Sequence, residues 1–218
     1  MQDVIYMDNA ATTRTSREVV ESMIPYFTEH YGNASALYSF AQDAKIGLEN
    51  ARKQVAKVIG AKSEEIYFTA GGSEADNWAI KATAEFLKAK GNHIITSKIE
   101  HHAVLHSCQY LEQHGYEVTY LDVDEYGMIN LEELKAAIRP TTILITIMFA
   151  NNEIGTIEPI KAIGAIAKEN HIYFHTDAVQ AFGQVPIDVE EMNIDMLSAS
   201  AHKLHGPKGV GMLYIRKG

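Results

Sequence analysis

The sequence has little cysteine, no long apolar run and no excess of basic residues. The only cysteine, Cys108, leaves no pair for an intrachain disulfide and no cysteine cluster for a zinc or iron–sulfur site. Lys and Arg total 19 against 28 Asp and Glu, a formal net charge of −9, which disfavours nucleic acid or an anionic membrane as a partner. The N-terminus has no basic, apolar leader, so we expect a cytoplasmic location, with small molecules or other proteins as partners.

The 218 residues read as one domain, because no repeat, low-complexity tract or Pro/Gly/Ser-rich linker divides them. Apolar residues at three- and four-residue spacing predict a helix over about residues 16–29 and a long amphipathic helix over 39–59. Beyond residue 60, short β-branched and aromatic runs alternate with helical patterns such as 131–138 and 160–169. The predicted strands cover residues 66–69, 93–97, 117–121, 143–148, 172–175, 196–199 and 211–215.

Repeated strand–helix–strand units predict an α/β fold, a three-layer sandwich with a mostly parallel central sheet covered by helices on both faces. The last predicted strand follows its predecessor with no room for a helix. It therefore either runs antiparallel at an edge of the sheet or re-enters the sheet differently.

Polar clusters follow five of the predicted strands. Open α/β sheets bind ligands beyond the carboxyl ends of their strands, where loops and helix N-termini converge. We therefore expect one binding site to contain side chains from these clusters. They are Gly71–Glu74, Glu100–His102, Ala150–Glu153, Asp177–Gln180 and Ser200–Lys203.

The first cluster runs from a strand through Gly71 and Gly72 into the start of a helix. Free backbone N–H groups at a helix N-terminus favour a phosphate, and the Ser73 hydroxyl adds a donor. The alternative is a tight turn in which Ser73 caps the helix. The sequence matches neither a Walker A loop nor a dinucleotide fingerprint.

Asp177 and Lys203 carry opposite charges at the ends of two predicted strands. A carboxylate in the apolar setting of Asp177 requires a cationic partner, such as the protonated nitrogen of a pyridine ring; the alternative is a helix N-cap. Lys203 directly follows an apolar strand, where desolvation lowers the pKa of an amine enough for imine formation; the alternative is a solvated loop lysine.

Three further side chains are candidates at strand ends. The imidazole of His101 is suited to stacking on a planar ring and to moving protons, and the amides of Asn152 and Gln180 are suited to hydrogen bonds with a ring oxygen. A metal site from His101, His102 and His106 is disfavoured, because adjacent histidines point in different directions and no acidic or cysteine ligand has matching spacing. Cys108 falls on the apolar stripe of its helix, which favours a buried structural residue over a nucleophile.

Together these motifs resemble, in order along the chain, those of the class V aminotransferase family, and within it the cysteine desulfurases of the NifS/IscS type. The last motif is the most specific. The segments that carry the resemblance are Tyr6–Thr13, Gly32–Ser35, Phe68–Asn77, Glu100–Val104, Asn151–Gly155, His175–Gln180, Ser198–Lys203 and Gly206–Gly209.

The resemblance implies the large domain of a fold type I transferase that uses pyridoxal 5′-phosphate (PLP). Residues 16–218 would form this PLP-binding domain, and residues 1–15 would be an N-terminal segment associated with the family's small domain. Lys203 would carry PLP as a Schiff base and later act as the base at the substrate Cα, and His101 would stack on the ring and move protons. The implied cofactor contacts are Gly72, Ser73, Ser200 and His202 with the phosphate, Asp177 with the ring nitrogen, Gln180 with the ring hydroxyl, and Asn152 on the substrate side.

The implied reaction converts L-cysteine to L-alanine and passes the sulfur, through an enzyme persulfide, to an iron–sulfur scaffold or a thiolation partner. A homodimer is expected, because the sites of this family lie at the subunit interface. The sequence departs mildly from the family at Ala34, Ala36 and the Gly72–Ser73 pair, where the family more commonly has Ala–Thr.

A larger departure is that the chain stops at Gly218, where such enzymes continue into a small domain with the nucleophilic cysteine and the arginine that binds the substrate carboxylate. We therefore expect a large-domain polypeptide, a fragment or half of a split enzyme, that binds PLP without completing sulfur transfer. Two alternatives remain: another class V enzyme, such as a selenocysteine lyase or a small-amino-acid aminotransferase, or a non-catalytic PLP-binding assembly or regulatory subunit.

Overall fold

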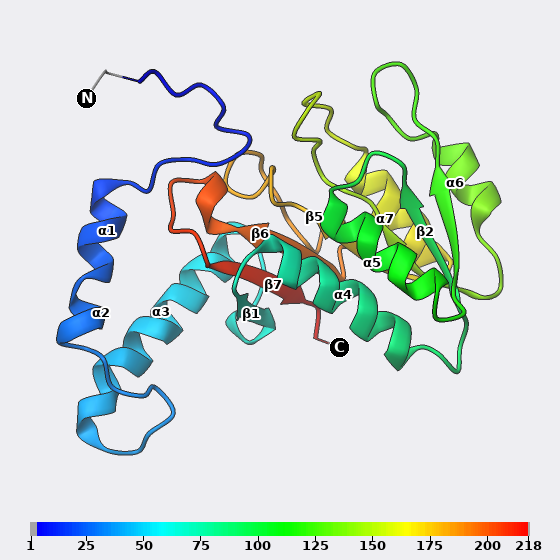
Figure 1. The fold of residues 1–218 in the computed structure, drawn as a ribbon. Coiled ribbons are helices and arrows are strands. Elements are labelled where there is room, and N and C mark those ends of the chain that lie inside the picture. The colour runs from blue at the N-terminus through cyan, green and yellow to red at the C-terminus, as the bar shows by residue number, and fades with distance from the viewer. Residues whose placement is uncertain (1–3, 218) are drawn as a thin grey trace.

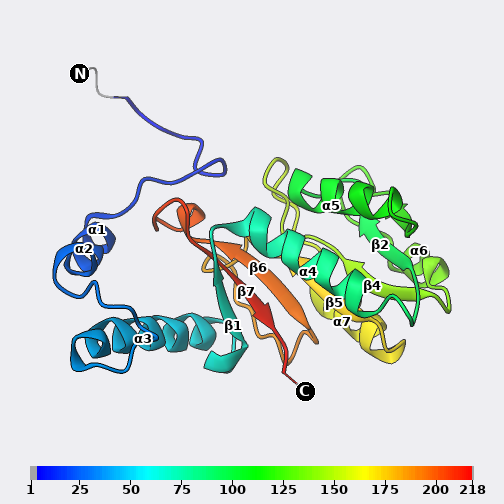
Figure 2. The ribbon, with the colours of Figure 1, turned by 60° about the horizontal axis from the view of Figure 1, so that its bottom comes forward.

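The computed structural model describes residues 4–217, which build a single seven-stranded sheet (Figures 1 and 2). Its order is β1-β7-β6-β5-β4-β2-β3. Strands β2 to β6 run parallel to one another, and β7 is antiparallel to both β1 and β6. The predicted mostly parallel sheet is confirmed, but β7 lies inside the sheet and β1 takes the edge. The strands are β1 (Ile66–Thr69), β2 (His93–Ser97), β3 (Glu117–Leu121), β4 (Thr142–Thr146), β5 (Tyr173–Asp177), β6 (Met196–Ser200) and β7 (Gly211–Ile215).

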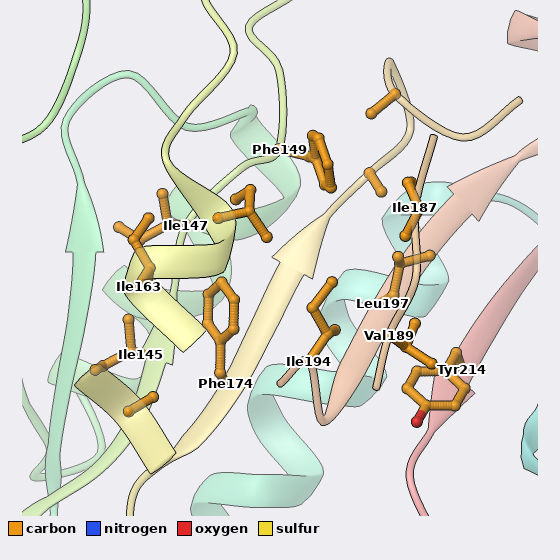
Figure 3. Close-up of a cluster of buried hydrophobic side chains, with 14 of the residues drawn as sticks. Ile145, Ile147, Phe149, Ile163, Phe174, Ile187, Val189, Ile194, Leu197 and Tyr214 are labelled. Atoms are coloured by element: carbon orange, nitrogen blue, oxygen red, sulfur yellow. The ribbon is translucent and has the colours of Figure 1, made fainter. Parts of the chain in front are cut away.

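Helices cover both faces of the sheet, which confirms the three-layer architecture. The helices α4 (Gly72–Phe86) and α5 (His102–Glu112) pack on one face, with Ile94, Leu144 and Leu213 beneath them. The neighbouring strand residues Ile95, Ile145 and Tyr214 point to the other face, because side chains alternate along a strand. There they pack with α6 (Leu131–Ala137), α7 (Ile160–Glu169) and the end of α3 (Gln42–Val58), a core that is shown in part in Figure 3.

The N-terminal helical region differs from the sequence-based prediction. The single helix predicted over 16–29 is wrong: α1 (Arg17–Met23) ends and α2 (Pro25–Thr28) begins at Pro25, which has no backbone N–H to continue the hydrogen-bond ladder. The long helix over 39–59 begins with the 3₁₀ turn η1 (Ser39–Ala41) and continues as α3. Two other 3₁₀ turns are η2 (Ser63–Glu65) and η3 (Ala201–Lys203).

Helix α3 extends away from the sheet with α1 and α2 beside it (Figures 1 and 2). Its predicted apolar face is therefore only partly covered: Phe40, Leu48 and Val58 are 49%, 40% and 52% exposed. Within residues 4–217, no helix is both long enough and apolar enough to cross a membrane.

Candidate functional site

A cavity of about 450 Å³ lies beyond the carboxyl ends of β5 and β6, at the start of α4. Its volume falls in the range of small-molecule sites. The structure brings all nine residues that the sequence analysis selected for the site to its walls: Gly72, Ser73, His101, Asn152, Asp177, Gln180, Ser200, His202 and Lys203.

The start of α4 forms one end of the cavity. Gly71 precedes the helix in an extended conformation, with φ of 156° and ψ of 178°, and no side chain caps the helix, so its first N–H groups are left for other acceptors where Gly72 and Ser73 line the cavity. A Cβ on Gly72 would lie 2.5 Å from Val179 Cγ2, so a glycine lets α4 begin directly against the loop after β5. Ser200 and His202 line the same end, with Lys208 in an adjoining hollow. This donor set suits a phosphate group.

The amine of Lys203, in η3, contacts the N-terminal segment. Its Nζ donates hydrogen bonds to the carbonyls of Ala10 and of Ala11, the latter at 3.0 Å. Burial lowers the pKa of Lys203, and the charges of Asp177, Asp8 and Glu153 oppose that shift. The same segment is held by Gln180 Nε2, which donates to Ala10 O at 2.9 Å.

Asp177 is the last residue of β5 and is 5% exposed. Its Oδ1 accepts a hydrogen bond from Val179 N–H at 2.9 Å. Burial raises the pKa of Asp177, while that hydrogen bond and the charges of His101 and Lys203 act in the opposite direction. Within residues 4–217 no cationic nitrogen lies within 4.0 Å of this carboxyl group, so the site lacks the partner that a buried carboxylate requires.

His101 is the N-cap of α5, four residues after β2 ends at Ser97. Its Nδ1 accepts a hydrogen bond from Ala103 N–H at 3.1 Å, which leaves Nε2 as the ring nitrogen free to act on a ligand. Asn152 lies in the turn after β4, where its Nδ2 donates to Glu153 Oε1 at 2.7 Å.

Three acids at the cavity were not assigned a role from the sequence. Asp76 is on α4, Asp8 is in the N-terminal segment, and Glu153 is in the turn after β4. Asp76 follows Gly72 by one helical turn and falls among the buried positions Ala75, Ala79 and Ile80, so its place on an apolar helix face was the available signal. Within residues 4–217 the one group of three potential metal ligands is Asp76, His101 and Asp177.

Cys108 is fully buried on α5, as its place on the apolar stripe predicts. Burial raises the pKa of the thiol to about 12. Because the thiolate is the reactive form, this cysteine is inert as a nucleophile in the folded chain.

Residues 5–218 match the family model described as aminotransferase class V, and the chain belongs to this family. Within the family it is homologous to cysteine desulfurases. It is 63% identical, over 98% of its length, to "Cysteine desulfurase IscS" of Methanosarcina thermophila and 61% identical, over its whole length, to the protein of the same name from Clostridium botulinum strain Hall. It covers 53% and 55% of these two relatives, so it spans about half the length of the curated relatives that it matches.

Solved structures give the same result for the fold. A chain described as "SspA in complex with cysteine" matches with a TM-score of 0.96 and 47% identity, over 98% of this chain and 62% of that one. A "NIFS-like protein" matches with a TM-score of 0.95 and 44% identity, over 98% and 59%. The predicted fold of a class V PLP enzyme is therefore confirmed.

Proposed function

We propose that this chain is the PLP-binding part of a cysteine desulfurase, with L-cysteine as the substrate. The observation that carries the proposal is one cavity that combines an amine of lowered pKa, a buried carboxyl group without a cation, and the N-terminus of α4. These three features match the aldehyde, the ring nitrogen and the phosphate of PLP. The names of the relatives and the cysteine complex of a similar structure support the substrate.

Each residue has a role that follows from its chemistry. The backbone and hydroxyl of Gly72 and Ser73, together with Ser200 and His202, would hold the phosphate. Asp177 would hold the ring nitrogen in its protonated form, Gln180 would face the ring hydroxyl, and Asn152 would line the substrate side. When bound, PLP supplies an electron sink for the charge that develops at the substrate Cα.

Lys203 and His101 would act on protons. Burial gives Lys203 a larger neutral fraction than a surface lysine has, which favours attachment to the aldehyde carbon, and the same amine would later accept a proton from the substrate Cα. His101 would stack on the ring and move protons through Nε2, since its Nδ1 is held by the backbone.

The sulfur-transfer step requires a nucleophilic thiolate, which Cys108 does not supply. We therefore propose that residues 16–218 are the cofactor-binding domain, that residues 1–15 belong with the family's small domain, and that a further segment or chain brings the nucleophile. A homodimer and an iron–sulfur scaffold or thiolation partner as sulfur acceptor belong to the same proposal.

Reconstitution with PLP tests the first half of this function. We expect a yellow protein whose colour borohydride removes, with the label on Lys203 by peptide mass spectrometry. The Lys203→Ala variant should bind PLP only by dialysable contacts. A wild-type protein that stays colourless after reconstitution would contradict the proposal.

Addition of L-cysteine tests the second half. The absorbance of the bound cofactor should change on mixing, whereas intact mass should show no sulfur added to Cys108, with Cys108→Ala as the control. Transamination that depends on a keto acid would instead favour another class V enzyme. A cofactor spectrum unaffected by any amino acid would favour a non-catalytic subunit.

A further inference from the structure

A second buried carboxyl group lies beside Asp177 on the floor of the cavity. Asp76 is 1% exposed and Asp177 is 5% exposed. One oxygen of each lies within 4.8 Å of the other and of a ring nitrogen of His101. In the described part of the chain, the one basic side-chain nitrogen within 4.0 Å of the Asp76 carboxyl group is His175 Nε2, which lies 3.7 Å from Asp76 Oδ1. Two buried carboxyl groups this close cannot both be charged at low cost, which favours a shared single negative charge.

His175 does not supply the missing positive charge. Burial lowers the pKa of this fully buried histidine to about 3, so it is neutral at physiological pH. Its Nδ1 lies 2.8 Å from Thr146 Oγ1 and its Nε2 lies 3.0 Å from Ser198 Oγ. Asp76 therefore faces a neutral imidazole rather than an imidazolium.

Both ring nitrogens of His175 are occupied by hydroxyl groups, Nδ1 by Thr146 and Nε2 by Ser198. A neutral imidazole donates through one ring nitrogen and accepts through the other, so these two hydroxyl groups satisfy it fully. The contacts hold His175 between β4 and β6, with its Nε2 3.7 Å from Asp76 Oδ1.

Besides His101, the titratable groups that act on Asp76 are acids. Burial is the largest cause of its raised pKa, and the charges of Asp177, from β5, and Glu100, from the loop before α5, add to it. Glu100 is itself held by Ser97 Oγ at 2.7 Å and Met148 N–H at 2.9 Å, and burial raises its pKa to about 8. Asp76 Oδ1 and Glu100 Oε2 are buried without a hydrogen-bond partner.

We propose that Asp76 is a positioning residue of the ring-nitrogen site, which keeps the proton of the carboxyl pair and leaves Asp177 as its single anion. One negative charge then faces one protonated ring nitrogen. No proton moves when the ring binds, since Asp76 remains an acid and Asp177 a carboxylate in both states. The identity of the ring rests on the proposed function, whereas the proton on Asp76 is a property of the chain alone.

The first arm of the test uses PLP-free protein labelled with ¹³C in the aspartate carboxyl groups. We expect one protonated carboxyl signal at neutral pH, which disappears in Asp76→Asn and titrates above neutrality in the wild type. Asp195→Asn is the matched control, because Asp195 is a largely buried acid at the opposite end of the sheet with Arg216 Nε at 3.3 Å. An ionised Asp76 signal at neutral pH would overturn the proposal.

The second arm measures the dissociation constant of PLP. Asp76→Asn is neutral and of the same shape, so its affinity should stay within about threefold of the wild type, whereas Asp76→Ala removes the buried side chain beside Asp177 and should lose about tenfold, which corresponds to about 1.4 kcal/mol. An Asn variant as weak as the Ala variant would show that Asp76 acts as an anion and would overturn the proposal. Wild-type protein that binds no PLP but retains the protonated signal would instead defeat the proposed function and leave the proton assignment intact.

Discussion

At the scale of single residues, Gly72 shows how tightly the phosphate end of the cavity is built. The position faces Val179 across a gap that has no room for a methyl group. Gly72 does not have a left-handed backbone conformation, so the requirement for glycine comes from the contact with Val179 and not from the turn itself.

We expect Gly72→Ala to lower the unfolding free energy by about 1–3 kcal/mol, the usual cost of an overpacked site, and to weaken PLP binding, because α4 must shift away from the phosphate. Val179→Ala should be mild alone and should restore both quantities when combined with Gly72→Ala. Thermal unfolding and PLP titration of the four proteins form a double-mutant cycle, and additive losses would rule out the proposed contact.

The residues that line the cavity were largely predictable, because open α/β sheets bind ligands beyond the carboxyl ends of their strands and the polar residues at those ends therefore lie close together. Lys203, Asp177 and the start of α4 meet as that rule requires. The burial of Asp76 could be inferred from its place on an apolar helix face, but its role could not, since that depends on distances to Asp177 and His175 of β5, which no local pattern encodes.

At the scale of elements, α5 begins on a residue with two separable tasks. His101 caps the helix through Nδ1 and presents the rest of its ring to the cavity. A change at this position therefore alters helix stability and cofactor contacts together unless the new side chain retains the cap.

We expect His101→Asn to retain the cap, since asparagine is a favoured N-cap residue, while His101→Ala lowers the unfolding free energy by about 0.5–2 kcal/mol. Both should change the absorbance of bound PLP by the same amount if the ring stacks on it. Chemical denaturation and spectroscopy separate the two effects, and equal stability of the Asn and Ala variants would contradict the capping role.

The order and type of elements followed from periodicity, but their ends and neighbours did not. Pro25 divides a stretch whose apolar spacing reads as one helix, because spacing takes no account of a missing N–H. The position of β7 inside the sheet depends on its pairing with β1, about 145 residues earlier in the chain, which local sequence does not specify.

At the scale of the whole molecule, buried acids give the cofactor-free protein a distinctive pH dependence. Burial raises the pKa of Glu100 to about 8 and that of Glu158 to about 7, while it lowers that of His175 to about 3. Between pH 6.5 and 8 the folded state binds protons that the unfolded state has released, so stability falls as the pH rises.

We expect the unfolding free energy of the PLP-free chain to decrease across this range, with each acid contributing at most about 1.4 kcal/mol per pH unit. Glu100→Gln, which retains an acceptor for Ser97 and Met148, should flatten the slope. Urea unfolding at several pH values measures it, and parallel curves for the two proteins would refute the assignment.

A second feature of the molecule as a whole is the set of exposed apolar residues on α2, η1 and α3. Phe27, Phe40 and Leu48 are 70%, 49% and 40% exposed, and Phe27 and Leu48 line an apolar groove between α3 and the α1–α2 pair. Exposed apolar surface of this kind favours association. Sedimentation velocity should show concentration-dependent self-association that Phe27→Glu with Leu48→Glu reduces; a monomer at every concentration would contradict this expectation.

Two carbonyl groups of the N-terminal segment compete with any ligand for the amine of Lys203. Before any aldehyde can take Lys203, the amine must leave the carbonyls of Ala10 and Ala11, and loss of Gln180 from Ala10 would free that stretch further. Residues 10 and 11 would then be released when a ligand binds to Lys203, so their mobility would report whether the pocket is occupied.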